Sequence, residues 1–175
     1  MRPARGIPMH ALRALRILIV DDNAQMRTII GSVLSAAGVR FLRYAPDGVR
    51  GLQALEEFQP DLCYVDYEMP GLNGLGFTRA VRARQTADRY MPIIMLTGHS
   101  DLIRLNAARD AGVTEFLCKP ASARSMLRRL ESAIKDPRPF IDTPDYFGPD
   151  RRRRRTGAYA GPLRRQSDRS AHLEI

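Results

Sequence analysis

The 175-residue sequence has few cysteines, few lysines and no long apolar run, and these shortages exclude several classes of protein. Its two cysteines, Cys63 and Cys118, both lie within apolar stretches, which favours two buried, reduced thiols over a disulfide. No apolar run approaches the length needed to cross a membrane, and no apolar segment of signal-peptide type follows the basic N-terminus. We therefore expect a cytoplasmic protein.

Positive charge is concentrated at the two ends of the chain. The net charge is +9, but residues 16–136 carry sixteen basic against fourteen acidic side chains and are close to neutral. Residues 1–15 carry three arginines and no acid, and residues 137–175 carry nine arginines against five acids. We predict a basic N-terminal extension over 1–15, one compact domain over 16–136, and a proline- and arginine-rich, largely disordered tail over 137–175.

Short apolar runs alternate with longer amphipathic segments throughout the central domain. The apolar runs predict strands at residues 16–20, 40–45, 62–66, 91–97 and 115–119. The amphipathic segments predict helices at residues 23–37, 47–58, 74–84, 101–111 and 122–134. Five successive strand–helix units indicate an α/β fold of the doubly wound type, with a parallel sheet covered by helices on both faces.

Polar side chains stand at the carboxyl ends of four of these strands. They are Asp21 and Asp22 after the first strand, Asp66 on the third, Thr97 on the fourth and Lys119 on the fifth. Each could serve alone as a helix cap or satisfy backbone groups. Because parallel strands deliver their carboxyl ends to one edge of the sheet, we expect the five to meet there and form a functional site.

The chemistry of these side chains points to a metal ion and a phosphoryl group. Three carboxylates in one pocket repel each other, and an all-oxygen ligand set favours Mg²⁺ over Zn²⁺. An aspartate can act as nucleophile and become an acyl phosphate, while Lys119 neutralises phosphoryl oxygens and Thr97 donates a hydrogen bond. An Asp-nucleophile phosphohydrolase of the haloacid dehalogenase type is disfavoured, because Glu68 stands where such enzymes have a second aspartate.

The same residues resemble the receiver domain of two-component response regulators, in particular the chemotaxis-type single-domain arrangement. The resemblance covers about residues 16–134 and rests on "DD" after "ILIV", on "VDYEMPG", on "MLTG" and on "FLCKP". It implies a flavodoxin-like sheet in the order 2-1-3-4-5 and a cis Lys119–Pro120 peptide bond. It also implies a protein that is not a dedicated enzyme, phosphorylated by a sensor histidine kinase or a histidine phosphotransfer protein.

The resemblance further assigns roles to individual residues. Asp66 is the implied phosphoacceptor, supplied by a phosphohistidine donor. The implied Mg²⁺ ligands are Asp21, Asp22, Asp66 and the backbone carbonyl of Glu68. Thr97 and Phe116 are the implied switch residues, where Phe116 replaces the tyrosine of many members and can pack inward without an outward hydrogen bond.

The tail shows no sign of a DNA-binding output domain, so we expect the receiver to act by docking on a protein partner. The tail also carries an internal repeat. Tyr-x-Gly-Pro-x-Arg-Arg occurs twice, thirteen residues apart. The tail is either a solvated segment or a docking element for an anionic ligand such as a cyclic dinucleotide or RNA. In composition it resembles the tails of receiver-like proteins that bind cyclic di-GMP. The candidate ligand-binding residues are Tyr146, Arg151, Arg152, Tyr159, Arg164 and Arg165.

Overall fold

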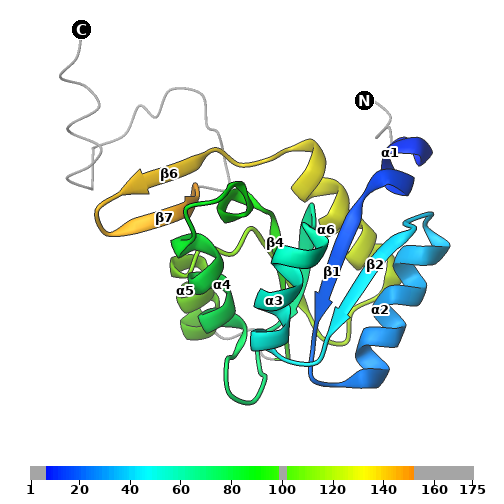
Figure 1. Cartoon of the computed structure of the whole chain (residues 1–175), viewed down its shortest axis with the longest axis horizontal. Helices are drawn as coiled ribbons and strands as arrows, with labels where there is room; N and C mark the ends of the chain where they lie inside the picture. Colours follow the sequence, from blue (N-terminus) through cyan, green and yellow to red (C-terminus); the bar gives the residue numbers. More distant parts are fainter. Residues whose placement is uncertain (1–6, 99–101, 152–175) are drawn as a thin grey trace, which may run out of the picture.

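A computed structural model describes residues 7–98 and 102–151, and its centre is a parallel sheet between two layers of helices (Figure 1). In the described residues this sheet has five strands in the order β2-β1-β3-β4-β5, which confirms the predicted fold class. The strands are β1 (Arg16–Val20), β2 (Phe41–Ala45), β3 (Leu62–Asp66), β4 (Ile93–Thr97) and β5 (Glu115–Cys118).

The helices divide between the two faces because neighbouring residues of a strand point to opposite sides of the sheet. On β1, Leu18 and Val20 pack beneath α3 (Gly48–Phe58), α4 (Gly74–Ala83) and α5 (Leu102–Asp110). Ile17 and Ile19 pack on the other side, with α2 (Ala24–Ala36) and α6 (Ala123–Lys135). Both faces are therefore buried, which explains why the strands are continuous apolar runs.

Side-chain caps fix where the helices begin after the strands. The Asn23 side chain accepts hydrogen bonds from the backbone amides of Gln25 and Met26, and so begins α2 two residues past the Asp21–Asp22 pair. Asp47 begins α3 in the same way by accepting from the amide of Arg50. Because each cap stops a helix from extending back toward the sheet, the loops at the strand ends stay free for polar side chains.

A short helix precedes the sheet, and the two cysteines differ in exposure. Helix α1 (Met9–Ala14) belongs to the predicted basic extension, and its Leu12 packs against the core on the α2 and α6 side. Cys63 is buried as expected, but Cys118 is exposed, so the prediction of two buried thiols is wrong for Cys118. Cys118 is the last residue of β5, where the strand leaves the protection of the helices. In the described part of the chain, no helix is long and apolar enough to cross a membrane.

The first part of the tail is folded, which corrects the prediction of a largely disordered segment from residue 137 onward. Strands β6 (Phe140–Thr143) and β7 (Tyr146–Pro149) pair antiparallel as a hairpin. Figure 1 places this hairpin at the opposite end of the molecule from the tips of the β1 and β2 arrows. Residues 152–175, which hold the rest of the predicted tail, lie outside the described residues.

Aromatic packing attaches the hairpin to the domain. The rings of Phe140 and Phe147 lie 5.1 and 5.3 Å from that of Tyr90, in the 3₁₀ helix η1 (Ala87–Tyr90). Gly148 lies directly on the turn before β5, where a Cβ atom would come within 2.9 Å of the Cα of Gly112. The tail was misjudged because proline spacing argues correctly against a helix but does not exclude short strands that pack on another part of the chain.

Two arginines, Arg82 and Arg138, form polar contacts where the hairpin region meets the domain. Arg82, at the end of α4, is buried, and its guanidinium donates to the carbonyls of Gly112, Arg89 and Met91 at 2.7–3.0 Å. The same guanidinium lies 5.1 Å from the centre of the Phe140 ring. Burial lowers the pKa of Arg82 to about 10, so this side chain remains charged at neutral pH. Arg138, before β6, pairs with buried Glu115 at the start of β5 at 3.1 Å.

Candidate functional site

An acidic cluster lies at the edge of the sheet formed by the carboxyl ends of its strands, at the ends of β1 and β3. Asp21 follows β1 and is fully buried, Asp22 beside it is exposed, and Asp66 is the last residue of β3 and is 6% exposed. One carboxylate oxygen of each lies within 4.8 Å of the others. Strands β1 and β3 are direct neighbours, with Val20 opposite Val65, so the sheet register itself brings the three carboxylates together.

Lys119 reaches this cluster from the end of β5. Its Nζ lies 2.8 Å from Oδ1 of Asp66 and 3.1 Å from Oδ2 of Asp21. The Lys119 backbone amide donates to the carbonyl of Thr97 at 2.8 Å, which joins the ends of β4 and β5. The Lys119–Pro120 peptide bond is cis, as the resemblance implied. One cation is therefore shared between two buried carboxylates, and the cluster retains excess negative charge.

Two residues that the sequence did not single out support the backbone of this site. Nη1 of Arg27, on α2, donates to the carbonyl oxygens of Asp21 and Asp22 at 2.6 and 3.2 Å. Gly74, at the start of α4, lies so close to β3 that a Cβ atom would collide with the carbonyl oxygen of Asp66. Neither has a local sequence signal, because both contacts depend on how a helix packs against a neighbouring strand end.

The electrostatics of the site follow from burial and from the shared lysine. Burial raises the pKa of Asp66, and the nearby charges of Asp21 and Asp22 raise it further, against the lowering effect of the Lys119 contact. For Lys119, burial lowers the pKa, but hydrogen bonding and attraction to Asp66 and Asp21 outweigh this, so its pKa is raised. Ionising Asp66 in the protein without a bound cation therefore costs free energy, and a divalent cation would remove that cost.

The donor set fits Mg²⁺, and it predicts a pH-dependent stabilisation by this ion. Because the folded-state pKa of Asp66 is raised, its ionisation removes stability as the pH rises through the interval between its ordinary and its raised pKa. Mg²⁺ binds the ionised form, so we expect it to raise the midpoint of thermal unfolding most at neutral pH and progressively less as the pH falls through that interval. Thermal unfolding with and without Mg²⁺ across pH measures this. An increment that stays constant with pH would contradict it.

The remaining predicted site residues lie around this cluster. Thr97 ends β4 and is 2% exposed. Phe116 lies within β5 opposite Met95 and packs, half-buried, against the core on the α3–α5 side. The carboxylate of Glu68 is not a member of the acidic cluster and instead forms an ion pair with Nη1 of Arg104, on α5. Only its backbone carbonyl stays a predicted metal ligand.

The described tail residues lie away from the acidic cluster. The Tyr146 hydroxyl donates to the carbonyl of Pro149 at 2.8 Å, and the Arg151 guanidinium lies 3.8 Å from the centre of the Tyr146 ring. Arg151 also pairs with Asp110, at the end of α5, at 3.2 Å. Tyr146 and Arg151 of the first copy of the repeat therefore have partners within the chain, and their role in ligand binding stays a prediction. Arg152, Tyr159, Arg164 and Arg165 lie outside the described residues.

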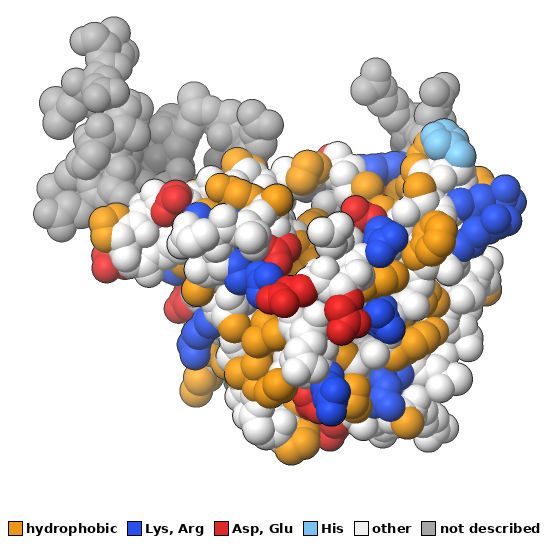
Figure 2. All heavy atoms as spheres, in the orientation of Figure 1, with side chains coloured by type: hydrophobic (Ala, Val, Ile, Leu, Met, Phe, Trp, Pro, Cys, Tyr) orange, Lys and Arg blue, Asp and Glu red, His pale blue; other side chains and the backbone are white. Residues whose placement is uncertain are grey.

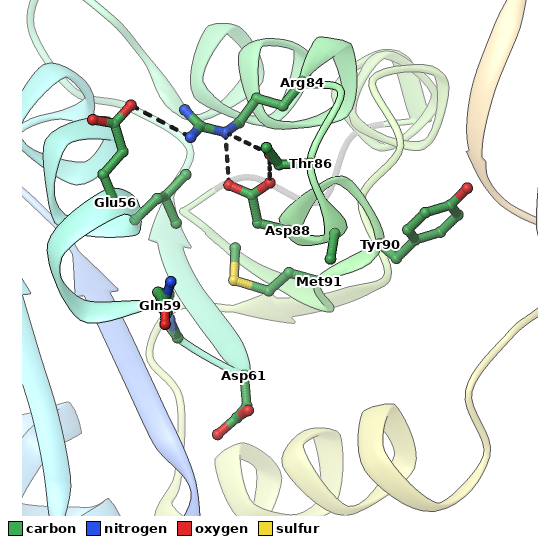
Figure 3. A pocket seen from close by; sticks show the side chains of 11 residues that line it. Glu56, Gln59, Asp61, Arg84, Thr86, Asp88, Tyr90 and Met91 are labelled. Carbon is green, nitrogen blue, oxygen red and sulfur yellow. Dashed lines mark hydrogen bonds and ion pairs between the residues drawn. The ribbon is translucent and has the colours of Figure 1, made fainter.

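A cavity of about 600 Å³ lies beside the C-terminal end of α3 and η1. Figure 3 shows Arg84 between Glu56 and Asp88 on its rim, with Met91 and Tyr90 nearby. Arg84 pairs with Asp88 at 2.6 Å and with Glu56 at 3.4 Å. The three clustered aspartates and Lys119 do not line this cavity. Figure 2 shows acidic and basic side chains interspersed on this face, in keeping with the near-neutral charge of residues 16–136.

The sheet order and the three-aspartate edge with its lysine define a doubly wound α/β signalling domain of the receiver class. Residues 17–131 match the response regulator receiver domain family, and the chain belongs to this family. The chemotaxis protein CheY of Pseudomonas aeruginosa is 33% identical over 121 residues, which cover 69% of this chain and 97% of that protein. The structure of CheY4 from Vibrio cholerae superposes with a TM-score of 0.65 at 28% identity, covering 69% of this chain and 98% of that one.

Longer response regulators also match. The DNA-binding response regulator MtrA of Mycobacterium tuberculosis is 31% identical over 120 residues, which cover 69% of this chain and 50% of that protein. This chain thus spans about half the length of these curated relatives. The comparisons therefore establish a receiver domain of two-component signalling, a class of signalling proteins whose acidic cluster binds Mg²⁺.

Proposed function

We propose that this chain is a phosphoacceptor response regulator that receives a phosphoryl group on Asp66 from the phosphohistidine of a sensor kinase or a histidine phosphotransfer protein. The observation that carries the proposal is the position of the Asp66 carboxylate. It lies at the end of the sheet's central strand, 2.8 Å from Nζ of Lys119 and within 4.8 Å of oxygens of Asp21 and Asp22. A nucleophile, a phosphoryl-neutralising cation and a metal-binding pair thus share one edge.

The transfer step follows from these groups. A carboxylate oxygen of Asp66 attacks phosphorus, the phosphorus–nitrogen bond breaks, and its electron pair returns to the imidazole of the donor. Lys119 neutralises a phosphoryl oxygen, and the Thr97 hydroxyl donates a hydrogen bond to another. When bound by Asp21, Asp22, Asp66 and the Glu68 carbonyl, Mg²⁺ would offset the charge that the carboxylates and the phosphoryl group bring together.

We further propose that phosphorylation is read by a protein partner at the face formed by α5, β5 and α6. Phe116 lies on β5, three residues before Lys119, and is half-buried against the core. We propose that it packs further inward when Thr97 moves toward the phosphoryl group. The same face is bordered by Leu102 and Ile103 of α5, which are 76% and 81% exposed. Exposed apolar side chains of this size support a role in protein docking.

Incubation with acetyl phosphate and Mg²⁺ tests the proposal directly. We expect intact-mass spectrometry to show the addition of one phosphoryl group that is stable in acid and lost in base, as an acyl phosphate would be. Chelation of Mg²⁺ before the donor is added should prevent the addition. If unfolding experiments show that Mg²⁺ is bound while no phosphoryl group is gained, the proposed function is wrong.

A further inference from the structure

Arg104 contacts the loop that follows Asp66, beside the acidic cluster. It lies on α5, which follows Thr97, and its guanidinium crosses to the loop that follows Asp66. There Nη1 forms an ion pair with Oε1 of Glu68, two residues past Asp66. The Arg104 Cζ also lies 5.5 Å from the centre of the Tyr67 ring. The side chain is 33% exposed, so this contact lies at the surface beside the site.

The charges of the site explain why such a contact matters. Lys119 together with a divalent cation would balance the three clustered carboxylates. The Glu68 carboxylate, which is 58% exposed, is an additional negative charge near the phosphoacceptor. Any phosphodonor is itself an anion, so an unneutralised Glu68 would repel it as it approaches Asp66. Arg104 forms an ion pair with Glu68 and so provides a positive charge that offsets it.

We propose that Arg104 is a positioning residue that neutralises and holds the Glu68 carboxylate, and so permits anionic phosphodonors to reach Asp66. This inference rests on the proposed function, since it concerns the rate at which Asp66 is phosphorylated. The loop it acts on is itself fixed, because the Tyr67 amide donates to the Leu96 carbonyl at 2.8 Å. The Tyr67 ring lies within cation–π distance of the guanidinium. Arg104 therefore has two contacts with this loop, the Glu68 carboxylate and the Tyr67 ring, although it lies near solvent.

The rate of phosphoryl uptake tests this inference. With acetyl phosphate and saturating Mg²⁺, we expect Arg104→Ala to lower the rate about three- to ten-fold at low ionic strength, and added salt to shrink the difference. The loss should be smaller with phosphoramidate, which carries less net negative charge than acetyl phosphate. Arg104→Lys should retain most of the rate, since it keeps the charge. Arg109→Ala, on the same helix and 43% exposed, is the matched control and should stay within about two-fold of the wild type.

A second variant separates electrostatic positioning from a structural role. Glu68→Gln removes the charge that Arg104 offsets and keeps the backbone carbonyl, so the double variant Glu68→Gln/Arg104→Ala should recover the rate lost by Arg104→Ala. A double variant as slow as Arg104→Ala would overturn the inference, and so would an Arg104→Ala rate equal to that of Arg109→Ala. Thermal unfolding of each variant checks its folding, and Arg104→Gln replaces Arg104→Ala if the latter is unfolded. Failure of the wild type to take up any phosphoryl group would instead overturn the proposed function, and the inference with it.

Discussion

The Asp66→Asn protein is expected to gain no phosphoryl group from acetyl phosphate under conditions in which the wild type is fully modified. The amide cannot act as the attacking oxygen, while Lys119 and Thr97 remain in place. The same substitution should raise the midpoint of thermal unfolding at neutral pH in the absence of Mg²⁺. We expect this rise because burial and the two neighbouring aspartates raise the pKa of Asp66, so the ionised carboxylate destabilises the folded protein at neutral pH.

Intact-mass spectrometry and thermal unfolding measure these two effects on the same samples. Asp142→Asn is the matched control, because Asp142 is an exposed aspartate in the hairpin, far from the acidic cluster. It should be phosphorylated like the wild type and show the wild-type stabilisation by Mg²⁺. Full phosphorylation of Asp66→Asn would show that another side chain accepts the phosphoryl group, and the assignment of Asp66 would be wrong.

Arg82→Met is expected to destabilise the protein by about 3 kcal/mol, because three carbonyl oxygens lose their donor in a buried position. For a folded unit of this size, that corresponds to a fall of roughly 6–12 °C in the midpoint of thermal unfolding. The contact with the Phe140 ring is lost as well, so the hairpin should become susceptible to protease before the rest of the domain unfolds.

Arg79→Met provides the control for this change. Arg79 lies on the same helix and is exposed, so its replacement should alter the free energy of unfolding by less than about 0.5 kcal/mol. Chemical denaturation and limited proteolysis of both variants give the comparison. If Arg82→Met is as stable as Arg79→Met, the buried guanidinium does not hold this part of the chain together.

The sheet and the residues at its carboxyl edge were predictable from the sequence because local patterns determine them. Apolar runs alternate with capped amphipathic segments, and parallel strands necessarily place their ends at one edge. Asp21, Asp66 and Lys119 therefore meet as expected, at 2.8–3.1 Å between the lysine and the two aspartates. Such contacts follow from topology alone, and topology is what a repeating strand–helix pattern specifies.

Contacts between elements distant in sequence were not predictable in the same way. Arg27, Gly74 and Arg104 each lie on a helix and contact the end of a strand or the loop that follows it, and no local sequence pattern distinguishes them from other helix residues. The hairpin was missed for a related reason. Its strands have four residues each, and β7 contains both glycine and proline, so the stability of the hairpin comes from η1, Arg82 and Gly112 rather than from strand propensity.

The hairpin places the end of the folded unit beyond residue 136, which matters for the design of truncated fragments of this protein. A fragment cut after residue 136, at the boundary that composition suggests, would lose Arg138, Phe140 and Phe147 together. It would leave Glu115 without one of its two arginine partners and remove both ring contacts of Tyr90, which is already 50% exposed. A defect in phosphorylation or partner binding of that fragment would then combine damage to the receiver with loss of the arginine-rich segment. A fragment that ends after Arg151 keeps the domain intact and isolates the contribution of the arginine-rich segment beyond it.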